Sequence, residues 1–109
     1  MNGKIYKGTT HTFRFRFPYV ENQVTNLAII FAQNGECRLE KNIDDCELDG
    51  DVLEVTLTPQ ETNLFSHKLY LQTQLYYKLY TGETKATEVS TFSVHRVLRD
   101  STFEPNGSL

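Results

Sequence analysis

One short segment decides the fold of this chain: Thr12-Phe13-Arg14-Phe15-Arg16-Phe17. Its phenylalanines fall on one face of an extended backbone, and its threonine and arginines fall on the other. This alternation is typical of a half-buried β-strand. Pro18 follows at once and has no N–H to donate to a sheet, so the strand ends there. The segment predicts a sheet that packs one face on a hydrophobic core.

Further strands follow from the same reasoning. The longer ones are predicted at Asn26 to Gln33, Val52 to Leu57, Leu69 to Tyr77 and Val89 to Val97. The first of these is apolar on both faces, and we interpret it as a central strand covered on both sides. A single core should take one side chain from each of four strands: Phe15, Ile29, Val55 and Leu71.

Turn signals separate the strands. Asn34-Gly35 predicts a tight hairpin into a return strand at Cys37 to Glu40, because both residues tolerate a positive φ. Asp49-Gly50 joins Cys46 to Leu48 with the strand that follows. Thr58-Pro59-Gln60-Glu61 combines an N-cap hydroxyl, a proline at the first helical position and a glutamate three residues after the cap. It predicts one short helical turn near residues 59–65, with Leu64 and Phe65 closing one end of the core.

Short strands with frequent turns favour an all-β fold, an immunoglobulin-like antiparallel β-sandwich, over a closed barrel, which is the alternative. The 109 residues suit one domain rather than two. We expect the sandwich to occupy residues 1–98. Residues 99–109 carry Pro105 and Asn106-Gly107-Ser108 and are expected to form a mobile C-terminal tail.

Composition and charge exclude several classes of protein. A net charge of −3 provides no diffuse basic field for a nucleic acid or an anionic membrane. The polar N-terminus lacks the apolar region of a signal peptide, and the longest apolar run, Leu27 to Ala32, is too short to span a bilayer. We therefore expect a protein made in the cytoplasm, with Cys37 and Cys46 as free thiols.

The search for chemistry finds no catalytic or cofactor signature. Asp45 to Gly50 resembles the first half of a calcium loop, but the twelfth position falls on Thr56 instead of an acidic ligand. A solvated acidic hairpin tip is favoured, and a weak cation site at Asp44 to Asp51 stays open. The three histidines, His11, His67 and His95, are too scattered for a zinc site. We predict no enzymatic activity, no cofactor and no metal.

The remaining candidate is a surface. If Leu69, Leu71, Thr73 and Leu75 face the core, then the opposite face is lined by Tyr70, Gln72, Gln74 and Tyr76, followed by Lys78 and Tyr80. Tyrosine offers a large contact area at low conformational cost, which suits protein binding. An ordinary outer sheet face is the alternative, since tyrosine also favours strands.

Three segments resemble a known group of proteins: Ile5 to Phe15, Leu57 to Phe65 and Lys85 to Val94. They are similar to small phage and prophage tail proteins of Firmicutes, in particular to the immunoglobulin-like N-terminal domains of baseplate upper proteins. The resemblance implies a structural role in the virion, docking to other tail or baseplate subunits, with no catalytic residues. Baseplate proteins continue into long further regions, so the resemblance leaves either a stand-alone accessory protein or a single structural module.

Two functions from different classes follow. The favoured one is a non-enzymatic structural or adaptor module whose partners are other tail or baseplate proteins, with self-association as a further option. The alternative is a carbohydrate-binding module with Tyr70, Tyr76 and Tyr80 as its sugar platform. The absence of tryptophan counts against sugar, because stacking platforms favour the largest ring.

Overall fold

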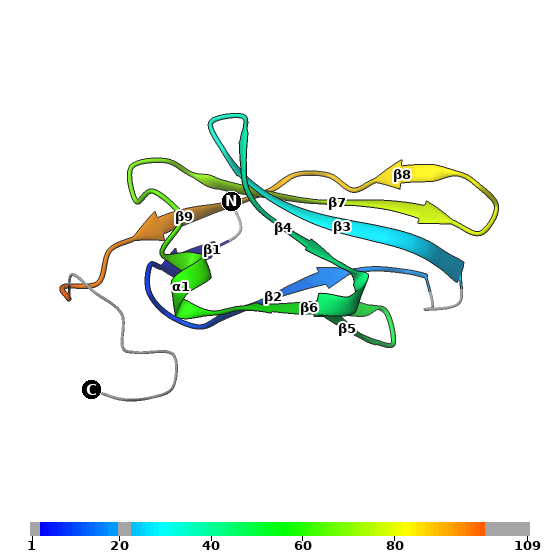
Figure 1. The fold of residues 1–109 in the computed structure, drawn as a ribbon, viewed down its shortest axis with the longest axis horizontal. Helices are drawn as coiled ribbons and strands as arrows, with labels where there is room; N and C mark the ends of the chain where they lie inside the picture. The colour runs from blue at the N-terminus through cyan, green and yellow to red at the C-terminus, as the bar shows by residue number, and fades with distance from the viewer. Residues whose placement is uncertain (1–2, 20–22, 100–109) are drawn as a thin grey trace.

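The computed structural model describes residues 3–19 and 23–99, and they form two packed β-sheets (Figure 1). The larger sheet contains β1 (Gly3–Tyr6), β3 (Val24–Gln33), β4 (Glu36–Asn42), β7 (Leu71–Leu79), β8 (Thr84–Ala86) and β9 (Ser90–His95). The smaller sheet contains β2 (His11–Arg16), β5 (Cys46–Asp49) and β6 (Val52–Leu57). The helix α1 (Pro59–Thr62) lies at one end of the sandwich (Figure 1).

The strand order is that of an immunoglobulin-like sandwich. The larger sheet has the order β1-β9-β7-β3-β4, with β8 also paired to β7, and the smaller sheet has the order β2-β6-β5. The order β9-β7-β3-β4 corresponds to the G-F-C-C′ strands of a variable-type immunoglobulin domain, with β1 added beside β9, and β2-β6-β5 corresponds to its B-E-D strands. β1 runs parallel to β9, from Gly3 opposite Phe92 to Tyr6 opposite His95. The predicted immunoglobulin-like sandwich is confirmed, but the larger sheet is mixed rather than wholly antiparallel because β1 joins it in parallel. The alternative of a closed barrel is wrong because the two sheets remain separate.

The core confirms the register that was predicted for the segment Thr12 to Phe17, which covers most of β2 and the residue after it. Phe13 and Phe17 are each 2% exposed, whereas Arg14 and Arg16 are exposed. Ile29, Val55 and Leu71 are buried as predicted, and Phe15 packs against them while staying partly exposed. Phe31 packs near the centre, with its ring 5.2 Å from that of Phe13 and 6.1 Å from that of Phe65.

One prediction about β3 is wrong. The strand is central, since it pairs with β4 on one side and β7 on the other. Of the six apolar residues at 27–32, however, only Leu27, Ile29 and Phe31 are buried, and the opposite face, with Ala28, Ile30 and Ala32, stays partly exposed. No element within the described residues packs over that face. Apolar residues on both sides of a strand thus do not imply a covering layer on both sides.

Both predicted hairpins are present. Asn34 and Gly35 have φ values of 52° and 79°, as a tight turn between two adjacent strands requires. In the second hairpin Asp49 pairs with Val52, so Gly50 and Asp51 form the turn, and only Gly50 has a positive φ (63°). Both turns follow from local sequence because few residues adopt a positive φ without strain.

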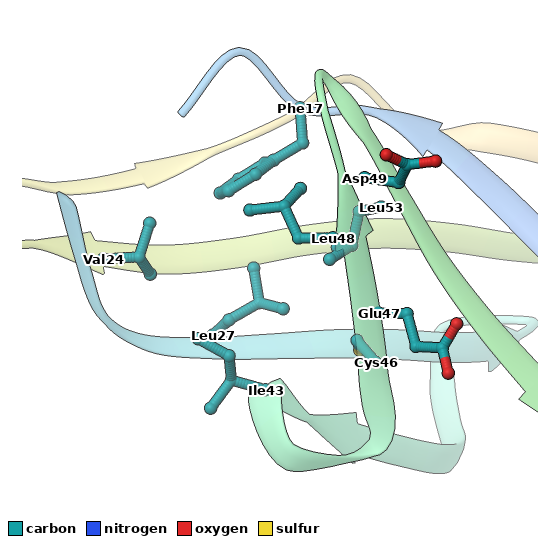
Figure 2. Close-up of a pocket in the computed structure, with 9 residues that line it drawn as sticks. All are labelled: Phe17, Val24, Leu27, Ile43, Cys46, Glu47, Leu48, Asp49 and Leu53. Atoms are coloured by element: carbon teal, nitrogen blue, oxygen red, sulfur yellow. The ribbon is translucent and has the colours of Figure 1, made fainter. Parts of the chain in front are cut away.

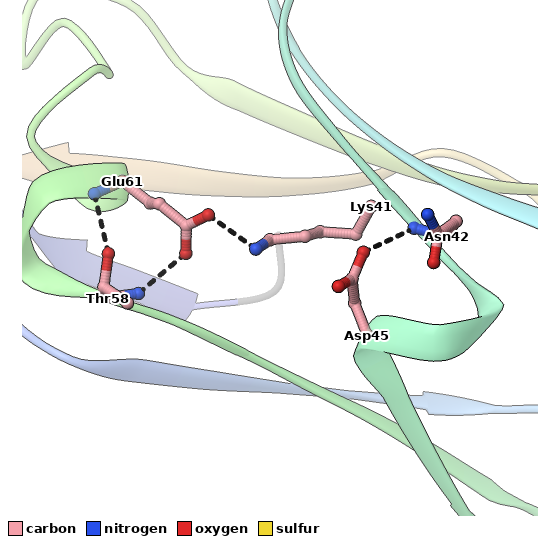
Figure 3. Close-up of polar contacts among 5 residues, drawn as sticks. All are labelled: Lys41, Asn42, Asp45, Thr58 and Glu61. Atoms are coloured by element: carbon pink, nitrogen blue, oxygen red, sulfur yellow. Dashed lines mark hydrogen bonds and ion pairs between the residues drawn. The ribbon is translucent and has the colours of Figure 1, made fainter.

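α1 carries the chain from the smaller sheet to the larger one. The Thr58 hydroxyl accepts the Glu61 N–H, and the Glu61 carboxylate accepts the Thr58 N–H, which completes the predicted capping box (Figure 3). Phe65 is fully buried after the helix, but Leu64 is 55% exposed, so the prediction that Leu64 closes the core is wrong. The helix ends at Thr62, and the turns that follow place only one of these two side chains inward.

Two buried polar side chains hold the connection from the smaller sheet to the larger sheet in place. The amide of Gln33 accepts the Ser66 N–H at 2.8 Å and donates to the carbonyls of Ser66 and Leu69. The Thr62 hydroxyl donates to the Thr9 carbonyl at 2.8 Å and accepts the Thr9 N–H at 3.2 Å. Because buried polar groups need partners, these bonds hold the loop after α1 in one position.

A salt bridge closes the side of the sandwich between β4 and α1. Lys41, near the end of β4, reaches the Glu61 carboxylate, and both side chains are mostly buried, at 17% and 22% exposed (Figure 3). Asn42, the next residue, caps a second helical turn, the 3-10 turn η2 (Ile43–Asp45), with a capping box of its own. The sequence prediction of one helical turn missed η2. Of the predicted tail 99–109, residues 100–109 lie outside the described part of the chain.

Candidate functional site: the outer face of the larger sheet

The predicted stripe belongs to a wider surface, which we call the outer face. On β7 it consists of Gln72, Gln74 and Tyr76. Their partners on β3 are Ala32, Ile30 and Ala28 respectively. Residues directly opposite in an antiparallel pair project to the same side of the sheet, so these six side chains form two adjoining rows.

The predicted binding residues differ in exposure. Tyr70 is 65% exposed and Tyr76 is 53% exposed, and Gln72 is also exposed. Gln74 is half-buried, because its amide donates to the Thr87 carbonyl at 2.8 Å and holds the segment between β8 and β9. Tyr70 directly precedes β7 and lies at the end of the stripe. Tyr70, Gln72 and Tyr76 are thus open to a partner, while Gln74 supports the sheet.

The outer face is apolar at its centre and low in charge. Ile30 lies between Gln74 and Glu40, and Ala86 of β8 lies beside Tyr76. Lys78 follows two residues after Tyr76 on the same side. Sequence reasoning missed Ala28, Ile30 and Ala32 as part of this surface, although their apolar character was visible in the sequence. The missing information was which side of β3 the smaller sheet covers.

A hollow of about 400 Å³ adjoins Tyr70 and is rimmed by basic groups. It is lined by residues from the loop before β7 and from the end of β9 with the residue after it, among them His67, Lys68, Ser93, His95 and Arg96. The Ser93 hydroxyl and His95 Nε2 are 2.9 Å apart. Loss of hydration and the positive charges of Arg96, Lys7 and Lys68 lower the pKa of His67. The same positive charges therefore make the His67 imidazole harder to protonate.

A second hollow, of about 540 Å³, opens between β3 and β5 (Figure 2). Phe17, Leu27 and Leu48 give it apolar walls, while the carboxylates of Glu47 and Asp49 point away from these side chains. Burial and the neighbouring Asp45 raise the pKa of the Cys46 thiol to about 11. The thiol is therefore protonated at neutral pH and is not an activated nucleophile.

The other sequence candidates lie apart from the outer face. In the acidic segment Asp44 to Asp51, residues 46–49 form strand β5, whose side chains alternate between two faces. The Asp45 carboxylate accepts the Asn42 N–H and so takes part in the cap of η2. No three His, Cys, Asp or Glu side chains gather as a metal site among the described residues. His11, His67 and His95 lie at the start of β2, in the loop before β7 and at the end of β9.

Both cysteines of the chain, Cys37 and Cys46, are free thiols, as predicted. The two sheets are thus held together without a disulfide. Within residues 3–19 and 23–99, no helix has the length and apolar character needed to cross a bilayer.

Comparisons with known proteins find solved structures of similar shape. No family model matches the chain, and no curated protein matches it. Two similar structures are strand-swapped dimers of mouse leukocyte-associated immunoglobulin-like receptor 1. The structure of that receptor's immunoglobulin-like domain matches with a TM-score of 0.47 and 14% identity, and the match covers 86% of this chain and 88% of that one. The structure of the same receptor's extracellular domain matches with a TM-score of 0.49 and 13% identity, and the match covers 95% of this chain and 89% of that one.

The V domain of amphioxus IgVJ-C2 is a third similar structure. It has TM-score 0.40 and 11% identity, and the match covers 87% of this chain and 99% of that one. Strand order and pairing within the chain itself assign the immunoglobulin-like β-sandwich fold.

Proposed function

We propose that this chain is a non-enzymatic adaptor module that binds another protein subunit through its outer face. The observation that carries the proposal is the partly exposed apolar row of Ala28, Ile30 and Ala32 beside the exposed Tyr76. Protein interfaces are enriched in aromatic residues and depleted in charge at their centre. A face that is apolar in the middle and bounded by glutamine and tyrosine fits this composition.

We further propose that the partner is a tail or baseplate protein of a phage or prophage, and that the chain is located in the virion. The support for this setting is the resemblance of residues 5–15, 57–65 and 85–94 to small tail proteins. The fold agrees with that resemblance, since the immunoglobulin-like domains of baseplate proteins are β-sandwiches.

The test is association with separately purified tail proteins, measured by light scattering and pull-down. Tyr70→Ala combined with Tyr76→Ala should abolish association and leave the melting temperature nearly unchanged, because both side chains are more than half exposed. Ile30→Glu should do the same by placing a charge at the centre of the outer face. Leu64→Ala is the matched control, since Leu64 is an exposed apolar side chain next to α1 and away from this face.

Three results would contradict the proposal. Unchanged association of the Tyr70/Tyr76 and Ile30 variants would mean that the contact lies elsewhere. Unfolding of the tyrosine variant would mean that its side chains belong to the core. Binding of purified cell-wall polysaccharide, lost in the tyrosine variant, would instead favour the carbohydrate-binding alternative with Tyr70, Tyr76 and Tyr80.

A further inference from the structure

The smaller sheet has an open edge along β2. β2 pairs with β6 over all six of its residues, from His11 opposite Leu57 to Arg16 opposite Val52. Among the described residues, no strand pairs with its other side. In immunoglobulin sandwiches a fourth strand, A, lies beside B at this place. Here β1 pairs with β9 on the opposite sheet instead, which leaves this place without a strand in the described part of the chain.

The backbone groups that face this edge can be identified. The Phe17 N–H donates to the Asp51 carbonyl on the side of β6. Because backbone groups alternate along a strand, Phe13 and Phe15 also face β6, and the N–H and C=O groups of Thr12, Arg14 and Arg16 face outward. Three donors and three acceptors are thus aligned for another strand.

A groove runs beside these groups. It has a volume of about 290 Å³ and lies between β2 and the first part of β9, lined by Phe13, Phe15, Ser90 and Phe92 among others. Phe15 and Phe92 are only partly buried, although both pack against the core. A strand added to β2 would direct every second side chain into this groove and cover both rings.

The other sheet edges are protected against such pairing. β4 carries Glu36, Arg38, Glu40 and Lys41, and its pairing with β3 shifts register between Phe31 and Ala32. β1 and β5 have four residues each. Short length, charge and irregular pairing are the usual means by which proteins block an edge. β2 has six residues and pairs with β6 without a register shift, so it is longer than β1 and β5 and more regular than β4.

The charges of Arg14 and Arg16 indicate which residue types an added strand should carry. Arg14 Nε contacts the Glu54 carboxylate at 2.6 Å, and one Arg16 amino group lies 3.3 Å from an Asp51 oxygen. The arginine side chains remain 64% and 87% exposed, and each guanidinium has five N–H donors in total. A lysine or arginine on the added strand would face like charge, whereas an aspartate or glutamate would share these donors. A second copy pairing through its own β2 would again bring only Thr12, Arg14 and Arg16 to this side.

We infer that β2 accepts an extended segment of another protein as an additional strand, and that this segment alternates apolar with acidic residues. The apolar side chains fill the groove beside Phe15 and Phe92, and the acidic side chains lie opposite Arg14 and Arg16. Main-chain bonds provide affinity, and the groove and the arginines provide specificity. The inference rests on the proposed role as a protein-binding module and assigns it a second, separate contact.

The test compares Arg14→Pro with Arg14→Thr. Proline removes an edge-facing N–H that β6 does not use, so the pairing of β2 with β6 is kept. Threonine removes the same charge and the same contact with Glu54 but keeps the N–H. Should Arg14→Pro fail to fold, Thr12→Pro with Thr12→Val as its control replaces this pair, because the Thr12 N–H also faces outward.

The probe is a displayed library of random dodecapeptides, selected on the wild-type protein. The expected peptides alternate apolar residues with Asp or Glu. They should bind Arg14→Pro at least about tenfold more weakly than Arg14→Thr. In the complex, hydrogen exchange should slow at the amides of Thr12, Arg14 and Arg16.

The inference is overturned if no peptide is enriched, if the enriched peptides lack alternation, or if Arg14→Pro binds them as well as Arg14→Thr does. A dimer of the protein alone that Arg14→Pro dissociates would make a second copy the occupant. If Tyr70→Ala with Tyr76→Ala abolishes tail-protein binding while both Arg14 variants bind peptides equally, the edge inference fails and the proposed function stands.

Discussion

At the scale of single residues, the hydroxyl groups of two buried threonines make opposite contributions to the free energy of unfolding. Thr62 is 0% exposed and bonds through its hydroxyl to both backbone groups of Thr9. Thr73 is 1% exposed, and its hydroxyl has no hydrogen-bond partner among the described residues. Burying a hydroxyl without a partner costs free energy, whereas removing a bonded one leaves its partners unsatisfied.

We therefore expect Thr73→Val to raise the free energy of unfolding by about 1 kcal/mol, because valine has a similar shape and no hydroxyl. Thr62→Val is the matched control and should lower it by about 2 kcal/mol, since the Thr9 N–H and C=O lose their partner. Urea unfolding monitored by tyrosine fluorescence measures both. A loss of stability in Thr73→Val would show that its hydroxyl has a partner.

At the scale of secondary-structure elements, the Lys41–Glu61 pair joins β4 to α1. Burial by itself raises the pKa of Glu61, but the hydrogen bonds from Lys41 and from the Thr58 N–H outweigh it, so the pKa lies below its usual value. A carboxyl group with a depressed pKa in the folded state stabilises that state at neutral pH. This stabilisation disappears as the pH falls through the folded-state pKa.

Glu61→Gln should thus lower the free energy of unfolding by about 2 kcal/mol at neutral pH, because glutamine keeps the capping bond but leaves the Lys41 charge unpaired. The penalty should shrink as the pH falls below the ordinary glutamate pKa of about 4.3 and through the lower folded-state pKa, because the wild-type carboxyl group then becomes protonated. Urea titrations across this pH range provide the measurement. Glu83→Gln is the control, since its pair with Lys85 is exposed and weak. A penalty that is independent of pH would refute the charge as its source.

At the scale of the whole molecule, aromatic packing joins the two sheets in place of a disulfide. Phe31 from the larger sheet contacts Phe13 from the smaller sheet, and Phe13 also packs edge-on to Phe92 at 5.1 Å. Phe17 and Tyr77 make a similar contact between the sheets at 5.0 Å. Two aromatic clusters therefore connect the layers at separate points.

Phe31→Ala should lower the free energy of unfolding by about 4 kcal/mol, since a fully buried ring is replaced by a cavity. Dithiothreitol should leave the melting temperature of the wild-type protein unchanged, because Cys37 and Cys46 are not bridged. Thermal unfolding followed by circular dichroism tests both statements. A lower melting temperature under reducing conditions would reveal a disulfide that supports the fold.

The sequence by itself determined the features that depend on neighbouring residues. The alternation of Phe13 with Arg14 set the buried face of β2, Asn34-Gly35 set a turn through its positive φ, and Thr58 with Glu61 set the cap of α1. Each feature depends on the backbone over at most a few residues, so local chemistry was sufficient. The exposure of Tyr70 and Tyr76 follows from the same rule, because successive side chains along a strand point to opposite faces of the sheet.

Only the tertiary structure decided the features that depend on distant partners. β1 pairs with β9 across almost the whole chain, and nothing in Gly3 to Tyr6 identifies that partner. The apolar residues Ala28 and Ile30 were predicted to be covered, but they lie on the outer face because the smaller sheet packs on the other side of β3. Hydrophobicity drives burial without specifying what covers each face, so the outer face and the open edge of β2 emerge only from the arrangement of the two sheets.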